Sequence, residues 1–235
     1  MNQPPVAQPP LSCRKAWAKY NRKDQSWMPL YRHLDDAACT AAVLWDSWLP
    51  ENARRIIAEP FGNGDNDSLE LARKLAIFVA AGHDIGKHSI PFATKAKPLR
   101  DEMALAGADF DTPQFSKDEL KQSPHSHYSA LSFKDWLKTK VTEPEMDAIY
   151  VIGIILAGHH GVYPTQPTRS KIYNAEHDMH WYTERFPRVR GDVPMRSLLR
   201  RYSQSFSPQA RRSSTTKNRE FFHWGILPAQ TGIFR

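Results

Sequence analysis

Apolar side chains recur every three or four residues along much of the chain. This spacing covers about residues 33–49, then 67–82, then 126–138, and it continues through the apolar run 146–156. Such a period places the apolar residues on one face of a helix, so each segment is predicted to be a helix that packs against its neighbours. No part of this region alternates apolar and polar residues as a half-buried strand does. The pattern therefore predicts an all-α fold.

Two of these helices carry capping residues at their predicted beginnings. Asp67 is placed to cap the second helix, with Glu70 three residues on as its capping partner. Thr142 and Glu145 form a similar pair before the last apolar run. The segment 88–124 mixes prolines, charges and short apolar pieces, which predicts loops with one or two short helices.

Composition divides the chain into three parts. Residues 1–14 are rich in proline and poor in apolar side chains, which favours a disordered lead-in. Residues 15–200 carry the helical patterns and are predicted to form one domain. Residues 201–235 are basic and show little periodicity, so we interpret this tail as a truncated or altered end of the domain.

The positive charge is concentrated late in the chain. The formal charge of the whole sequence is +7, and residues 162–235 hold 13 Lys and Arg against 5 Asp and Glu. That segment carries +8, so the first 161 residues carry −1. A basic segment joined to a near-neutral domain indicates a polyanion partner, and a solvated tail is the alternative.

The tryptophans suggest two different roles. Trp45 and Trp48 share a helix face with alanine and leucine and are expected to pack in the core. Trp181, with the neighbouring Tyr182, lies among arginines, which favours stacking on the bases of single-stranded DNA.

Membrane and thiol chemistry are disfavoured. The sequence has no run of about 18 apolar residues, which a membrane span requires, and its polar N-terminus does not resemble a secretory signal. Cys13 and Cys39 are the only cysteines and form no CxxC motif, which argues against a disulfide framework or a thiolate zinc site. These features favour a cytoplasmic protein without a membrane partner.

Imidazole and carboxylate groups lie at or near the ends of the predicted helices. Together they suit divalent first-row metals, and two such ions about 3.5–4 Å apart can clamp the attacking and leaving oxygens of a phosphodiester. A single histidine on a helix face is more often a core residue, so the signal lies in the group. The candidates are His33, His83, Asp84, His125, His127, His159 and His160.

The HDIGK segment is the most specific of these signals. His83 and Asp84 follow an apolar helix, and Gly86 permits an immediate tight turn. Lys87 places a cation beside the carboxylate, where it is suited to contact a phosphate oxygen or to offset negative charge in a transition state.

The order of the motifs resembles that of the HD superfamily of metal-dependent phosphohydrolases. The motifs are His33, HDIGK at 83–87, SHYSA at 126–130 and GHHG at 158–161. Taken together they are similar to the HD nuclease domain of the CRISPR-associated helicase-nuclease of type I systems, over about residues 15–165. The resemblance implies an all-α HD-domain helical bundle with a two-metal centre that cuts single-stranded DNA in antiviral defence.

The resemblance also implies a ligand set. Two divalent ions, chosen from Fe, Mn, Ni, Co and Mg, are expected to share Asp84, and Lys87 corresponds to the family's lysine beside the site. The implied ligands are His33, His83 and Asp84 for one ion, and Asp84, His127, His159 and His160 for the other.

One position in this set has two candidates. His127 is preferred because it shares a helix face with Ala130 and Leu131, and His125 is the alternative.

Two features depart from the family pattern. No GxxxxGK[ST] phosphate loop occurs, so no ATP site is expected in this chain. The helicase is then expected to be a separate subunit, or the chain an excised or truncated nuclease that joins a CRISPR surveillance complex. The family's late aspartate is also not identifiable, because Asp178 and Asp192 lack an apolar helical context. The ion at His33 is therefore expected to bind weakly or not at all.

Two other functions share part of this pattern. An HD phosphohydrolase that acts on nucleotides or cyclic dinucleotides would use the same His33, His83 and Asp84 within a closed pocket. A degenerate module that only binds a partner would explain the missing aspartate.

Overall fold

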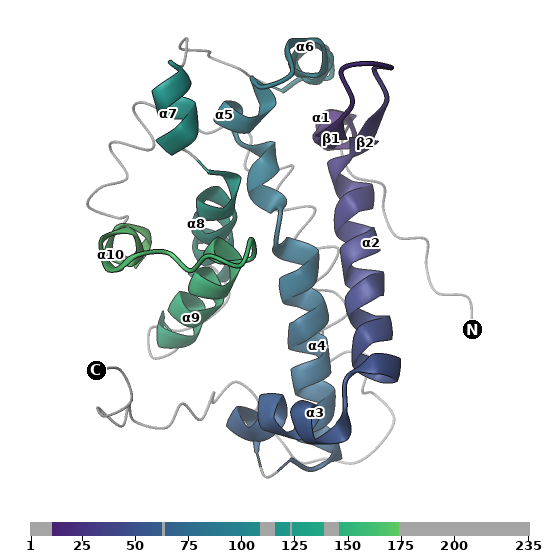
Figure 1. Ribbon diagram of the computed structural model, residues 1–235, viewed down its shortest axis with the longest axis vertical. Helices are drawn as coiled ribbons and strands as arrows, with labels where there is room; N and C mark the ends of the chain where they lie inside the picture. The colour runs from purple at the N-terminus through teal and green to yellow at the C-terminus, as the bar shows by residue number, and fades with distance from the viewer. Residues whose placement is uncertain (1–10, 63, 109–115, 123, 139–145, 174–235) are drawn as a thin grey trace.

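The computed structural model describes residues 11–62, 64–108, 116–122, 124–138 and 146–173, and all statements below concern these residues. They form an all-α fold with one small sheet (Figure 1). The elements are α1 (Leu11–Lys15), β1 (Trp17–Tyr20), β2 (Trp27–Pro29), α2 (Leu30–Val43), η1 (Leu44–Trp48), α3 (Glu51–Ala58), η2 (Glu59–Phe61), α4 (Asn66–Gly82), η3 (Ile85–His88), α5 (Ile90–Ala93), α6 (Lys97–Leu105), α7 (Lys117–Gln122), α8 (His125–Lys138), α9 (Met146–Ala157) and α10 (Gln166–Tyr173).

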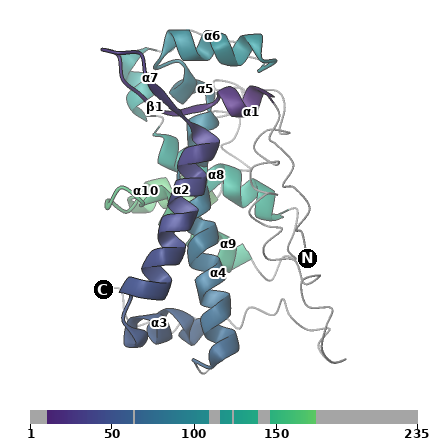
Figure 2. The same ribbon diagram turned by 90° about the vertical axis from the view of Figure 1, so that its right-hand side faces the viewer.

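The two long helices α2 and α4 lie side by side and form the spine of the molecule, as both views show (Figures 1 and 2). The helix pair α8 and α9 packs on the other side of α4 (Figure 1). A single apolar core joins both pairs, with Leu34, Phe78, Phe133 and Leu156 among its buried members. Burial of such faces removes apolar surface from water and is the main source of stability here.

The cap of α4 differs from the sequence prediction. Asp65, not Asp67, is the N-cap, and its side chain accepts a hydrogen bond from the backbone N–H of Ser68 at 2.8 Å. Asp67 lies in the first turn instead, where a carboxylate still interacts favourably with the positive end of the helix dipole. The helix thus begins slightly earlier than expected, and its end at Gly82 agrees with the prediction.

A two-stranded antiparallel hairpin precedes α2 and was not predicted. β1 pairs with β2, with Trp17 opposite Pro29 and Tyr20 opposite Trp27. The strands are only four and three residues long, so they are too short to show a clear alternation of apolar and polar residues. The hairpin leads directly into α2, so it lies next to the helix turn that carries His33.

The predicted helix over 33–49 ends in a π-helical turn. Leu49 donates its backbone N–H to the carbonyl of Leu44, which closes the wider i to i+5 ring. Because this turn holds more residues than an α-turn, Trp48 is rotated away from Trp45. Trp45 is 5% exposed and Trp48 is 72% exposed, so the prediction that both pack in the core is wrong for Trp48.

The middle of the chain and its N-terminal part differ from the sequence predictions. The region 88–124 holds the three short helices α5, α6 and α7, which is more than the one or two expected. Residues 11–14, assigned to the disordered lead-in, belong to α1. The cap at Thr142 and Glu145, and the tail 201–235, lie outside the described residues. In the described parts, no helix has both the length and the apolar character of a bilayer-crossing segment.

Candidate metal centre

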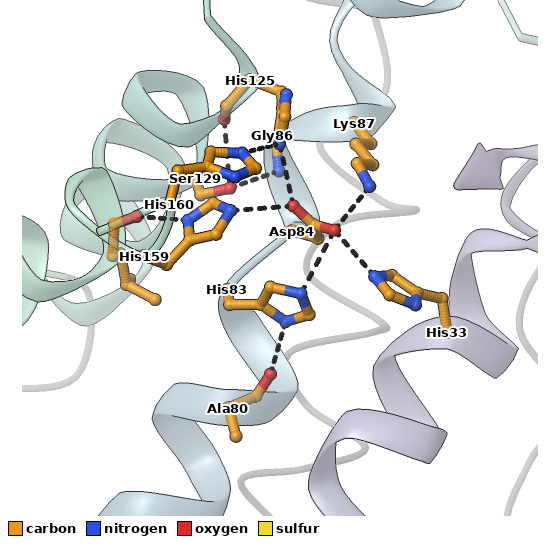
Figure 3. Close-up of polar contacts among 11 residues, drawn as sticks. His33, Ala80, His83, Asp84, Gly86, Lys87, His125, Ser129, His159 and His160 are labelled. Carbon is orange, nitrogen blue, oxygen red and sulfur yellow. Dashed lines mark hydrogen bonds and ion pairs between the residues drawn. The ribbon is translucent and has the colours of Figure 1, made fainter. Parts of the chain in front are cut away.

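Four helical segments bring polar side chains around one buried carboxylate, that of Asp84 (Figure 3). Asp84 is 3% exposed and follows the end of α4. The first turns of α2 and α8 and the end of α9 approach it from three other directions. The residues that meet there are His33, His83, Asp84, Lys87, His125, His159 and His160.

One carboxylate oxygen faces the α2 and α4 side of the cluster. Oδ2 of Asp84 lies 2.7 Å from Nε2 of His33 and 3.2 Å from Nε2 of His83. The ammonium of Lys87 lies 2.6 Å from the same oxygen. His33, His83 and Asp84 thus present three ligand atoms within 4.8 Å of one another.

The other oxygen faces α8 and α9. Oδ1 of Asp84 lies 3.0 Å from Nε2 of His125 and 3.2 Å from Nε2 of His159. Nε2 of His160 lies 3.0 Å from Nε2 of His125 and completes a second group of four ligand atoms. Asp84 is the one residue common to both groups among the described residues.

Burial alone would raise the pKa of Asp84 because it disfavours the charged carboxylate. The surrounding side chains of His125, His159, His33 and His83 outweigh this effect and hold the pKa of Asp84 well below its usual range. Burial lowers the pKa of His125. Burial and the neighbouring imidazoles also lower the pKa of His160. The site therefore favours an ionised Asp84 together with neutral imidazoles at His125 and His160, which is the protonation state that metal ligands need.

The orientation of two rings tests whether the site suits a metal. Nδ1 of His83 donates to the carbonyl of Ala80 at 2.7 Å, and Nδ1 of His159 donates to that of Leu156 at 2.7 Å. A carbonyl only accepts, so in the neutral rings the proton is on Nδ1 and Nε2 presents a lone pair. Both lone pairs then point at Asp84, an arrangement that a cation between them would stabilise.

Two buried polar atoms without a hydrogen-bond partner also indicate that the site suits a cation. Oδ1 of Asp84 and Nε2 of His159 both lack a hydrogen-bond partner within the described region, although the two atoms lie 3.2 Å apart. Buried polar atoms are normally satisfied, so each exception needs an explanation. Two electron-pair donors at this separation are explained by a shared divalent ion, and the mixed imidazole and carboxylate set suits first-row metals.

The structure brings His125, and not the preferred His127, into the cluster. His125, at the first position of α8, joins the cluster. His127 belongs to neither group of closely spaced ligand atoms in the described residues. The two positions lie two residues apart on a helix and so point to different sides. The face shared with Ala130 and Leu131 is a core face, and burial lowers the pKa of His127 there.

A glycine and a serine hold α8 against the segment that follows Asp84. The backbone N–H of Gly86 donates to Oγ of Ser129 at 2.9 Å, and Oγ donates to the carbonyl of His125 at 3.1 Å. Ser129 is fully buried. A Cβ on Gly86 would lie 2.0 Å from the carbonyl oxygen of His125, so the close approach requires glycine. The sequence motif contains both residues, but their contact joins positions 43 residues apart and could not be inferred from it.

One more histidine lies near the cluster without joining either group of ligand atoms in the described residues. His88 is buried next to Lys87 in η3, and burial lowers its pKa to about 4. The late aspartates Asp178 and Asp192, and the proposed stacking residues Trp181 and Tyr182, lie outside the described residues.

The chain is similar to proteins of one family. Residues 17–223 match the family model described as "Cas3, HD domain". A "CRISPR-associated nuclease/helicase Cas3" from Streptococcus thermophilus is 28% identical over 148 residues, which is 62% of this chain and 14% of that protein. The present chain therefore spans a small part of the length of this relative.

Two solved structures share the fold. One, described as "Crystal structure of CRISPR-associated protein", has a TM-score of 0.63 at 23% identity and aligns with 86% of this chain and 20% of its own. The other, "Crystal structure of T. fusca Cas3-ATP", has a TM-score of 0.50 at 18% identity over 83% of this chain and 23% of its own. At these identities the likeness concerns the fold.

Proposed function

Because this chain belongs to the Cas3 HD-domain family, we propose that it is a metal-dependent nuclease that cuts single-stranded DNA in CRISPR defence. The observation that carries the proposal is one buried carboxylate, Asp84, shared by two groups of ligand atoms. A shared carboxylate is the arrangement that two neighbouring ions require.

The residues of each group would hold one ion. His33, His83 and Asp84 form the first group, and Asp84, His125, His159 and His160 form the second. When bound, divalent ions in such a site lower the pKa of water and stabilise negative charge on a phosphodiester. The second group has four donors and the first has three, so we expect the second to bind its ion more tightly.

The protein's own side chains prepare the site for this chemistry. Asp84 remains ionised at neutral pH, so it presents both oxygens as ligands. The carbonyls of Ala80 and Leu156 fix the rings of His83 and His159, so the two Nε2 atoms are aimed before any ligand arrives. The ammonium of Lys87 lies 2.6 Å from Asp84, and we propose that it also stabilises negative charge on a phosphodiester bound beside that carboxylate.

The substrate and partners follow from the family and the charge. A similar protein is described as a nuclease/helicase, and this chain corresponds to 14% of it. We propose that the helicase function resides outside these 235 residues and delivers a single strand to the centre around Asp84. The basic segment 162–235 supports a nucleic-acid partner, and a CRISPR surveillance complex is the proposed source of the unwound target.

Metal-dependent cleavage tests the proposal. Circular and linear single-stranded DNA would be incubated with the chain and Mn, Ni, Co, Fe(II) or Mg in turn, beside Asp84→Ala. Cutting of the circle that needs a metal and is abolished in the variant supports an endonuclease. Hydrolysis of nucleotides or cyclic dinucleotides, with intact DNA, would assign the chain to the other HD phosphohydrolases. A folded chain that hydrolyses neither would be a binding module.

A further inference from the structure

A row of three cations leads from the metal centre towards the hairpin. Lys87 contacts Asp84, Lys95 follows α5, and Arg22 lies in the turn between β1 and β2. The guanidinium of Arg22 donates to the backbone carbonyl of Lys95 at 3.3 Å. The segment after α5 and the hairpin turn are therefore in direct contact beside the site.

One aromatic ring connects Lys95 to the metal centre. The ammonium groups of Lys95 and Lys87 lie 5.0 Å and 5.6 Å from the centroid of the Phe92 ring, within the range of cation–π attraction. Phe92 is 7% exposed, and its ring packs 4.4 Å from Trp17 and 5.4 Å from His125, centroid to centroid. Lys95 thus contacts the same ring, that of Phe92, which packs against His125 of the metal centre.

The charge of Lys95 is not neutralised by the surrounding protein. In the described part of the chain, neither Lys95 nor Arg22 forms an ion pair with a carboxylate. The neighbouring cations differ, because Lys97 and Arg100 both pair with Asp101 at 2.7 Å and 2.6 Å. Burial and then the charge of Lys87 lower the pKa of Lys95. Lys95 is exposed and is not paired with a carboxylate of the described residues, so its charge is available to an anion.

We propose that Lys95 and Arg22 form a phosphate-binding subsite beside the metal centre, which holds the backbone phosphate next to the one that is cut. The ligand class is a polyphosphodiester, because Lys87 serves the reacting phosphate and Lys95 and Arg22 are the next cations along the surface. This inference rests on the proposed nuclease function. It adds that the part of the strand beside the centre lies over the turn between β1 and β2.

Binding and cleavage of substrates with one or many phosphates test the subsite. Lys95→Gln, Arg22→Gln and the double variant would be compared with the wild-type chain. Lys97→Gln is the matched control. It removes the same charge only two residues from Lys95, but Lys97 is already paired with Asp101. Affinity for a labelled oligodeoxythymidine would be measured by fluorescence anisotropy in chelator at several salt concentrations. Hydrolysis of that oligonucleotide and of bis(p-nitrophenyl) phosphate, which has one phosphate, would be measured with Mn.

The subsite predicts that Lys95→Gln weakens oligonucleotide binding about threefold to tenfold, as expected for one phosphate contact. The slope of log affinity against log salt should fall by roughly 0.7 for each contact removed. Cleavage of the oligonucleotide should fall with affinity, while hydrolysis of the small phosphodiester should stay unchanged. Lys97→Gln should match the wild-type chain in every assay.

Two results would overturn the subsite. One is equal effects of Lys95→Gln and Lys97→Gln on the salt slope, which would mean that only overall charge matters. The other is an equal loss on the oligonucleotide and the small phosphodiester, which would place Lys95 in the metal centre itself. A wild-type chain that binds the oligonucleotide through Lys95 but hydrolyses neither substrate would refute the nuclease proposal and leave the subsite standing.

Discussion

Replacement of Gly86 by alanine tests how the fold assembles the metal centre. The added Cβ would lie 2.0 Å from the carbonyl oxygen of His125 and 2.4 Å from the backbone nitrogen of Ser129. Both are backbone atoms of α8, and real Cβ atoms essentially never come within 3.0 Å of a neighbour. The start of α8 must therefore withdraw from η3 by at least about 1 Å, and it carries His125 away from Asp84.

The expected cost has two parts. Overpacking of this kind destabilises a protein by about 1–3 kcal/mol, and a displacement of about 1 Å in a catalytic group lowers activity on the order of 100-fold. We therefore expect Gly86→Ala to lower both the free energy of unfolding, measured by urea denaturation, and the affinity for Mn, measured by calorimetry. Ser129→Ala removes the linking hydroxyl without overlap, so it should cost about 1–3 kcal/mol by leaving the Gly86 N–H unsatisfied.

Gly107→Ala is the control for the loss of glycine itself. Gly107 has a φ of +89°, and a Cβ added there would have no atom within 4 Å, so alanine meets strain but no overlap. It should cost about 1 kcal/mol and leave Mn affinity unchanged. Wild-type stability and Mn affinity in Gly86→Ala would show that this glycine does not hold α8 in place, and an equal loss of Mn binding in Gly107→Ala would show that the effect is not specific to Gly86.

Three further predictions concern single side chains. His125→Ala should weaken Mn binding at least about tenfold while His127→Ala stays near wild type, and the reverse order in calorimetry would restore the choice made from sequence. His88 has its pKa lowered to about 4 from an ordinary 6.5, so the unfolded chain takes up the proton first and stability is lost as pH falls from 6.5 towards 4. Urea unfolding should show that His88→Gln removes about 2 kcal/mol of the stability difference between pH 7 and pH 5, and an unchanged difference would show that His88 is not the titrating group. Trp45→Ala should cost about 3–5 kcal/mol and Trp48→Ala less than about 0.5 kcal/mol by thermal unfolding, whereas equal costs would place Trp48 in the core.

The helical part of the fold was predictable because its signal is local. The apolar period over α4, α8 and α9 repeats through several turns, and tertiary contacts only reinforce it. The hairpin β1 and β2 was missed because strands this short show no period and are stabilised by packing against distant residues. Trp17, for example, packs on Phe92, which lies far along the chain.

Most residues of the site could be identified from sequence motifs, but their arrangement in space could not. His33, Asp84 and the paired histidines at 159 and 160 were all identified from sequence, and the structure places them together. The exchange of His125 for His127 was not predictable, because it depends on where α8 begins and which of its faces meets η3. That contact is set by Gly86 and its partner on α8, which only the folded chain brings together.

The number of ions that the purified chain retains shows whether the cluster around Asp84 is a metal centre. The chain and the variants Asp84→Ala, His33→Ala and His160→Ala would be saturated with Mn, dialysed, and counted by elemental analysis. We expect at least one ion in the wild-type chain, none in Asp84→Ala, and a loss in His160→Ala that exceeds the loss in His33→Ala. A wild-type chain without ions, or an Asp84→Ala variant that retains as many as the wild type, would contradict this expectation.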